Sequence, residues 1–94
     1  MPAVGLIVWD LEILGAHSLK DKRSVVKSLK ERLQARFRVS AAETAYQEVW
    51  QRAQISATVV SSEHRHVQEV LDELDRFVKN DMRALVTRSE RSYY

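Results

Sequence analysis

Two amphipathic helical segments, each lying between two strand-like runs, most constrain what this chain can fold into. The first is predicted to begin near Leu19 and the second to lie between residues 61 and 80, and both have apolar residues on a 3.6-residue period. The apolar stripes are Leu19, Val26, Leu29, Leu33 and Phe37 in the first, and Val67, Val70, Leu71, Leu74, Phe77 and Val78 in the second. Since each helix has one apolar stripe, each is expected to pack on one shared surface.

Four strand-like runs supply that surface, at residues 4–14, 39–46, 52–61 and 82–88. In the first run Trp9 has the same parity as Ile7 and Leu11, which predicts that it lies in the core. Ser18, with Asp21 three residues later, predicts a capping box at the start of the first helix, and Ser61 or Ser62 is the predicted cap of the second. Residues 89–94 are predicted to form a polar C-terminal tail.

The resulting order β-α-β-β-α-β predicts an α+β, ferredoxin-like sandwich. Right-handed crossovers would place both helices on one face of a four-stranded antiparallel sheet with strand order 4-1-3-2. With 94 residues, the chain is long enough for a single domain spanning 1–94 and too short for a second one.

The composition excludes several classes of protein. Apolar residues make up 45% of the chain and charged residues 30%, but no apolar run approaches the roughly 20 residues needed to cross a bilayer. There is no cysteine and no pattern of a secretory signal, so we expect a cytoplasmic protein without disulfides or a membrane association. A net charge of +2 decides little about partners, which must be judged from where the charges lie.

Short motifs along nearly the whole chain resemble the YlxP-like family of small bacterial proteins, whose function is uncharacterised. The most specific are SLKDKR at residues 18–23 and WQRA at residues 50–53. The resemblance implies the ferredoxin-like fold and supplies no catalytic residues. Because the family's genes commonly lie among translation and ribosome-maturation genes, it also implies a connection with the ribosome or RNA. Members often have a histidine just before the Gln-x-x-Trp segment, where this chain has Tyr46.

Basic residues form a strip beside the apolar stripe of the first helix. The strip consists of Lys20, Arg23, Lys27 and Lys30, and Lys22 and Arg38 extend it at either end. Such a strip could follow an RNA phosphate backbone, or it could be the solvated flank of an amphipathic helix. Ser18, Lys20, Lys22 and Arg23 could also bind an anion at the positive end of the helix dipole.

A second candidate surface is the face of the sheet turned away from the helices. Val4, Leu6 and Val8 are predicted to lie there together with Val60. Exposed in a monomer, these side chains would form an apolar patch of roughly several hundred Å², which would favour a homodimer. Alternatively, Tyr93 and Tyr94 of the tail cover part of it. Trp50, in a short connection, could anchor a partner or fold over the sheet edge.

The sequence contains no enzymatic signature, and no catalytic, metal or cofactor residues are predicted. His64 and His66 point to different helix faces, and no glycine-rich phosphate loop is present. The leading hypothesis is a non-enzymatic accessory of translation or ribosome maturation that contacts ribosomal RNA or a ribosomal particle through the first helix. The alternative is a protein-interaction or regulatory module that uses its sheet face. No side chains identify a small-molecule ligand.

Overall fold

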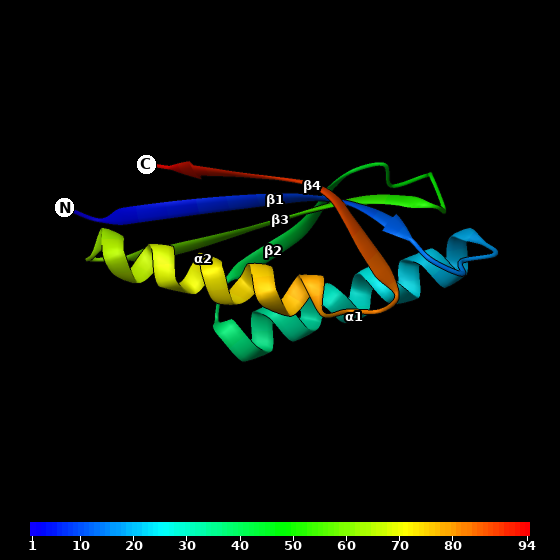
Figure 1. The fold of residues 1–94 in the computed structure, drawn as a ribbon, viewed down its shortest axis with the longest axis horizontal. Coiled ribbons are helices and arrows are strands. Elements are labelled where there is room, and N and C mark those ends of the chain that lie inside the picture. The colour runs from blue at the N-terminus through cyan, green and yellow to red at the C-terminus, as the bar shows by residue number, and fades with distance from the viewer.

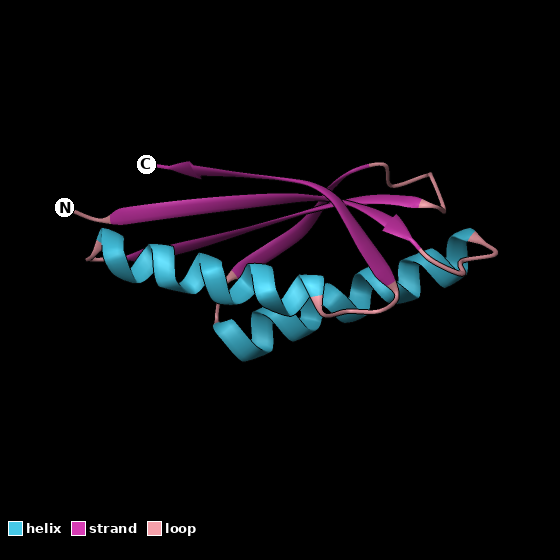
Figure 2. Cartoon of the chain, in the orientation of Figure 1, coloured by secondary structure: helices cyan, strands magenta, loops and turns pink.

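The computed structural model describes residues 1–94 and contains two helices and four strands. Their order is β1 (Ala3–Ile13), α1 (Leu19–Phe37), β2 (Ser40–Ala45), β3 (Arg52–Ser61), α2 (His64–Lys79) and β4 (Ala84–Tyr93). The strands form one antiparallel sheet in the order β2-β3-β1-β4, and both helices cover the same face of it (Figures 1 and 2). The predicted ferredoxin-like fold and its strand order are confirmed.

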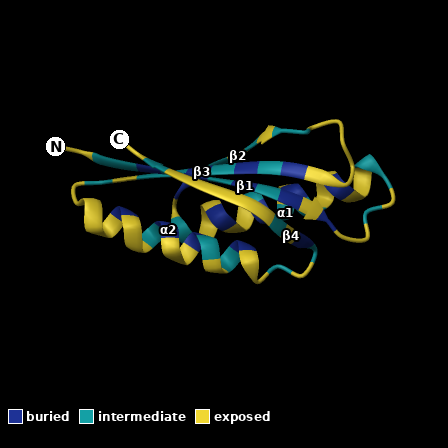
Figure 3. Ribbon diagram, turned by 45° about the horizontal axis from the view of Figure 1, so that its top comes forward, coloured by how far each residue is buried: buried dark blue, intermediate teal, exposed yellow.

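The hydrophobic core lies between the sheet and the two helices (Figure 3). Alternate residues of β1 point into it, and Trp9 is fully buried as predicted. The Trp9 indole Nε1 also donates a hydrogen bond of 2.9 Å to Asp75 Oδ1 on α2. At Gly5, α2 lies tightly against β1, since a Cβ at this position would overlap Val67 Cγ1. The missing side chain therefore lets α2 pack directly on the central strand.

Strand β4 is longer than the sequence predicted. The polar residues 89–93 belong to the strand and pair with β1, for example Ser89 with Trp9 and Tyr93 with Gly5. The predicted polar tail is therefore wrong except for Tyr94, whose main chain still pairs with Val4. Main-chain hydrogen bonds make the strand, and an edge strand exposed to water tolerates polar side chains.

The two helix starts differ in how they are capped. At α1 the predicted capping interaction is present, because Ser18 Oγ accepts a hydrogen bond from the Asp21 amide at 3.0 Å. At α2 the prediction of a serine cap is wrong. Glu63 is the N-cap residue and its side chain makes no capping hydrogen bond, while Ser61 Oγ accepts from the Glu63 amide at 3.3 Å.

Candidate functional site

A groove between α1 and the end of β2 brings together part of the predicted basic strip. Its volume is about 550 Å³, and its basic side chains Arg23, Lys27 and Lys30 all come from α1. They lie together because residues three and four apart share a helix face. The remaining lining residues are Val26, Glu31, Gln34, Glu43 and Gln47.

The basic side chains of this groove are weakly paired. Arg23 Nη2 lies 3.8 Å from Glu48 Oε1, and Lys27 Nζ lies 4.0 Å from Glu31 Oε1, with all four side chains largely exposed. Exposed ion pairs of this kind contribute little to the stability of the fold and are screened by salt. Lys30 forms no salt bridge at all. The cations of the groove can therefore exchange their present partners for an incoming anion at little cost.

Lys22 does not belong to this exposed strip. Its side chain is fully buried, and Nζ lies 2.6 Å from Glu43 Oε2 and donates hydrogen bonds to the main-chain oxygens of Tyr46 at 2.7 Å and Gln47 at 3.3 Å. The prediction that Lys22 binds RNA or an anion is wrong, because its three donors are used inside the protein. Lys22 instead neutralises Glu43, which removes a negative charge from the wall of the groove.

The chain bends sharply where Lys22 holds it. Tyr46 has a φ of 64°, a left-handed conformation that a tyrosine rarely adopts. The bend is stabilised by the Lys22 ammonium, which binds the carbonyls of Tyr46 and Gln47, and by the Val49 amide, which donates a hydrogen bond of 3.0 Å to Tyr46 O. Over the Tyr46 ring lies the guanidinium of Arg52, 4.1 Å from the ring centroid. Tyr46 therefore lies in a turn that is held by hydrogen bonds to its main chain and by packing of its ring.

The start of α1 is not an open anion site. Ser18 Oγ is used by the Asp21 amide, and Asp21 Oδ2 accepts a hydrogen bond of 3.1 Å from the His17 amide. A carboxylate thus already lies at the positive end of the helix dipole and would repel a second anion. Ser18 is thus engaged as the helix cap and Lys20 remains exposed near this end, and anion binding by either residue stays a prediction.

Arg38 lies at the opposite end of α1 from Lys20. It is the C-cap residue, with φ 54° and ψ 46°, and its amide donates a hydrogen bond of 3.1 Å to Gln34 O. Its side chain is exposed but does not line the groove. The structure therefore divides the predicted basic residues into three in the groove, two exposed beyond it, and one buried.

The uncovered face of the sheet has an apolar end and a polar end. Register places Val4, Leu6 and Val8 on this face, as predicted, and their side chains are half-buried by their neighbours. Val60 lies opposite Val4 and is 66% exposed. Tyr93 is turned to the helix side, where its ring meets His64 at 4.8 Å. Of the two tyrosines, only Tyr94 stands beside the apolar end.

Trp50 lies in the turn between β2 and β3 and is 42% exposed. It is not among the residues that line the groove. The structure thus leaves its indole available at the surface.

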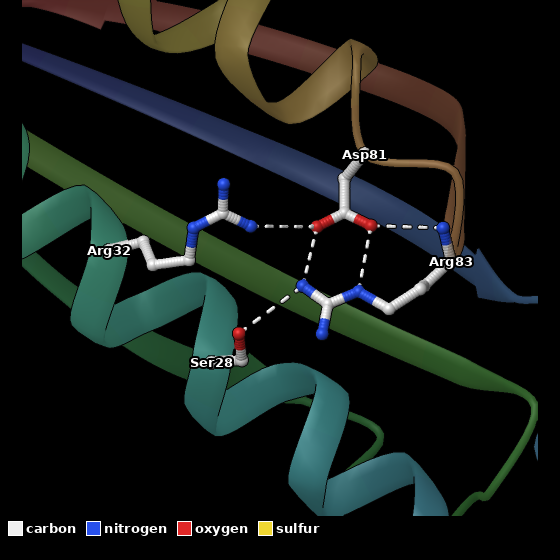
Figure 4. A network of polar contacts seen from close by, with 4 residues as sticks. All are labelled: Ser28, Arg32, Asp81 and Arg83. Carbon is white, nitrogen blue, oxygen red and sulfur yellow. Dashed lines mark hydrogen bonds and ion pairs between the residues drawn. The ribbon is translucent and has the colours of Figure 1, made fainter.

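A network around Asp81 was missed by the sequence reasoning (Figure 4). Asp81 accepts hydrogen bonds from the Arg83 amide at 2.9 Å and from Arg83 Nε and Nη2 at 3.0 and 2.7 Å, and Arg32 Nη1 lies 3.7 Å away. The Arg83 hydrogen bonds hold the pKa of Asp81 below its ordinary value. Arg83 also reaches Ser28 Oγ on α1 at 3.2 Å. The network therefore joins α1 to the loop before β4, and its signal in the sequence is only the Asp-x-Arg turn at 81–83.

A second groove, of about 610 Å³, lies between the C-terminal parts of the two helices. Arg32 and Arg36 lie over the Phe77 ring at 4.9 and 5.6 Å from its centroid. Arginines in the last turns of helices are stabilised by the negative end of the dipole, which accounts for Arg36 and Arg76 without a ligand.

No three histidine or acidic side chains lie close enough together to hold a metal ion. Neither helix is sufficiently long and apolar to span a lipid bilayer.

Fold and surface together define a small ferredoxin-like domain with a basic groove beside its first helix and an uncovered sheet face. The chain belongs to the family described as a protein of unknown function, DUF503, which matches residues 4–91. It is similar to the uncharacterized protein YlxP of Bacillus subtilis (strain 168), with 35% identity over 91 residues that cover 93% of this chain and 97% of that protein. The predicted membership of a YlxP-like family is confirmed.

Among solved structures, the chain is similar to a structural genomics protein, YJCS, with a TM-score of 0.55 and 13% identity. The likeness covers 95% of this chain and 96% of that one, and at this identity it concerns the fold alone.

Proposed function

We propose that this protein is a non-enzymatic, cytoplasmic accessory of translation or ribosome maturation that binds RNA phosphates through the groove between α1 and β2. The observation that carries the proposal is the row of Arg23, Lys27 and Lys30 along one wall of that groove. Weakly paired cations on a rigid helix suit a phosphate backbone, since phosphate contacts position a protein without reading sequence. The association with the ribosome rests on the resemblance to the YlxP-like family.

The acidic residues of the groove are compatible with this function. Glu43 is neutralised by the buried ammonium of Lys22, and Glu31 is held by Lys27 only at 4.0 Å. An incoming phosphate can therefore take the place of Glu31 beside Lys27. Gln34 and Gln47 add amide groups that can donate hydrogen bonds to phosphate oxygens.

Co-sedimentation with ribosomal subunits and precursor particles over about 50 to 500 mM salt tests the proposal. Release of counterions from RNA makes affinity fall with salt, and three contacts on a single-stranded segment predict a decrease of roughly a hundredfold over that range. The variant R23Q/K27Q/K30Q should lose saturable binding at 50 mM salt and show little remaining salt dependence.

A matched control removes the same charge elsewhere. The variant R36Q/R65Q/R76Q has the same net charge as the groove variant, but its substitutions lie outside the groove. If both variants lose binding equally, the attraction is non-specific and the groove is not the site. If neither the wild-type protein nor its control binds any particle even at 50 mM salt, the proposal fails.

The uncovered sheet face supports a second candidate function, a protein-interaction or regulatory module that oligomerises or docks a partner. The observation in its favour is that no helix covers Val4, Leu6 and Val8, and that Val60 beside them is 66% exposed. An apolar contact should depend weakly on salt, in contrast to a phosphate contact. The variant V60E should abolish such an association and leave RNA binding intact, whereas retention of the association would exclude this face.

A further inference from the structure

The outer edge of β4 is the longer of the two open edges of the sheet. β4 has ten residues and only β1 beside it, whereas β2, at the other end, has six. The pairing of β2 with β3 is also interrupted between Glu43 and Ala45. Short, irregular edges resist pairing with another chain, and β2 is of this kind. The register of β4 with β1 also shifts once, just before Arg88. From Arg88 onward the strand is regular, so no irregularity hinders pairing with another chain there.

Main-chain groups along this edge have no partner strand. Tyr94 and Val4 exchange both of their main-chain hydrogen bonds, at 2.9 and 3.1 Å. Because main-chain groups alternate in direction along an antiparallel strand, Ser92 and Glu90 also turn theirs toward β1. Ser89, Arg91 and Tyr93 therefore turn their N–H and C=O groups outward, away from the sheet.

The charges beside Ser89 make the edge complementary to itself. Arg88 and Glu90 lie opposite Asp10 and Val8 of β1, hence on the same uncovered face of the sheet, and they form a salt bridge with each other. A two-fold axis through Ser89 would place Arg88 opposite Glu90 of the partner subunit, and the reverse pair would form as well. An axis through Arg91 would instead place Arg91 opposite its own copy. Of these two registers, the pattern of charge favours the one centred on Ser89.

We propose that two copies of this chain associate edge to edge through β4, antiparallel and centred on Ser89, so that two four-stranded sheets become one of eight strands. Regular pairing runs from Arg88 to Glu90 in each copy, since the register of β4 with β1 shifts at Thr87. The uncovered sheet faces stay open in this arrangement. The basic groove lies at β2, the opposite edge of the sheet, so it also remains free. The proposed dimer therefore does not depend on whether the groove binds RNA.

A disulfide across the axis is the first test. The chain has no cysteine, so S89C introduces a single thiol. In the proposed register the two Cα atoms at position 89 would be about 5.5 Å apart, which a disulfide can bridge. The matched control T87C places its thiols four residue steps apart, about 14 Å, too far to bridge. We expect S89C to form a covalent dimer under mild oxidation at least tenfold faster than T87C.

Sedimentation of the unmodified protein provides the second test. S89P removes an outward N–H and leaves the ladder with β1 intact, so it should be folded by circular dichroism and monomeric. E90R would place two arginines opposite each other at both ends of the pairing and should raise the dimer Kd about tenfold or more. The double variant R88E/E90R restores opposite charges and should return the Kd to near the wild-type value.

Two results would overturn the proposal. One is a wild-type protein that stays monomeric at every concentration tested, with S89C oxidising no faster than T87C. The other is a dimer that survives S89P but is lost in V60E, because the two copies would then meet through their sheet faces.

Discussion

Replacing Lys22 with methionine should destabilise the protein by about 3 kcal/mol, although the sequence reasoning took this residue for an exposed extension of the basic strip. The ammonium is fully buried and forms an ion pair with Glu43 Oε2, a buried atom that has no other partner. K22M keeps the volume and the apolar stem of the side chain but leaves that carboxylate without its counter-charge.

The magnitude follows from the surroundings of Glu43. Removing one partner of a buried ion pair costs about 3 to 5 kcal/mol. The Glu43 side chain is 14% exposed and keeps some hydration, and the Tyr46 carbonyl keeps its hydrogen bond from the Val49 amide, which favours the lower end. For a domain of this size a loss of about 3 kcal/mol lowers the melting temperature by roughly 12 to 24 °C.

Urea unfolding, followed by tryptophan fluorescence and circular dichroism, measures this loss. K27M, an exposed lysine on the same helix, is the matched control and should change the free energy of unfolding by less than about 0.5 kcal/mol. The double variant K22M/E43L removes both charges and should recover to within about 1 kcal/mol of the wild type. If K22M loses less than about 1 kcal/mol, or if K22M/E43L is no more stable than K22M, the ion pair does not hold the turn and the reasoning is refuted.

Three further predictions concern the packing and pH dependence of the fold. G5A should cost about 1 to 3 kcal/mol in thermal unfolding, because its Cβ would lie 2.4 Å from Val67 Cγ1 on a packed helix; a neutral effect would mean that the helix can move away. D81N should be less stable than the wild type at pH 7 by about 1 to 3 kcal/mol in urea unfolding. Since the pKa of Asp81 is lowered in the fold, its contribution is present above the ordinary value of 3.8 and is lost as the pH falls below it, so the two proteins should converge toward pH 2. W9F should remove the blue-shifted part of the fluorescence, leaving the red-shifted emission of the 42% exposed Trp50; an unchanged spectrum would mean that Trp9 is not the buried indole.

Local pattern was enough to predict most of the fold. The parity of Ile7, Trp9 and Leu11 indicated which face of β1 is buried, and the helical stripes indicated how α1 and α2 pack. These inferences hold because burial of apolar surface dominates folding and repeats with the period of each element. The strand order then followed from right-handed crossovers.

Local pattern failed where polar groups make the structure. Residues 89–93 look like a tail because their side chains are polar, yet hydrogen bonds with β1 make them a strand. The same limit applies to the Asp81 network, since nothing near Asp81 in the sequence indicates that Arg32 and Ser28 of α1 lie beside it. Such contacts depend on positions that only the packed chain brings together.

The basic residues of α1 show most clearly which features the sequence determines and which depend on the tertiary structure. The sequence by itself determined that Arg23, Lys27 and Lys30 flank one apolar stripe, because a helical period fixes their angles around the axis. Only the tertiary structure decided that Lys22 is buried against Glu43 while the other three line an open groove. A long lysine side chain can extend to water or turn inward, and the choice depends on whether a carboxylate and free carbonyls from a distant part of the chain lie within its reach.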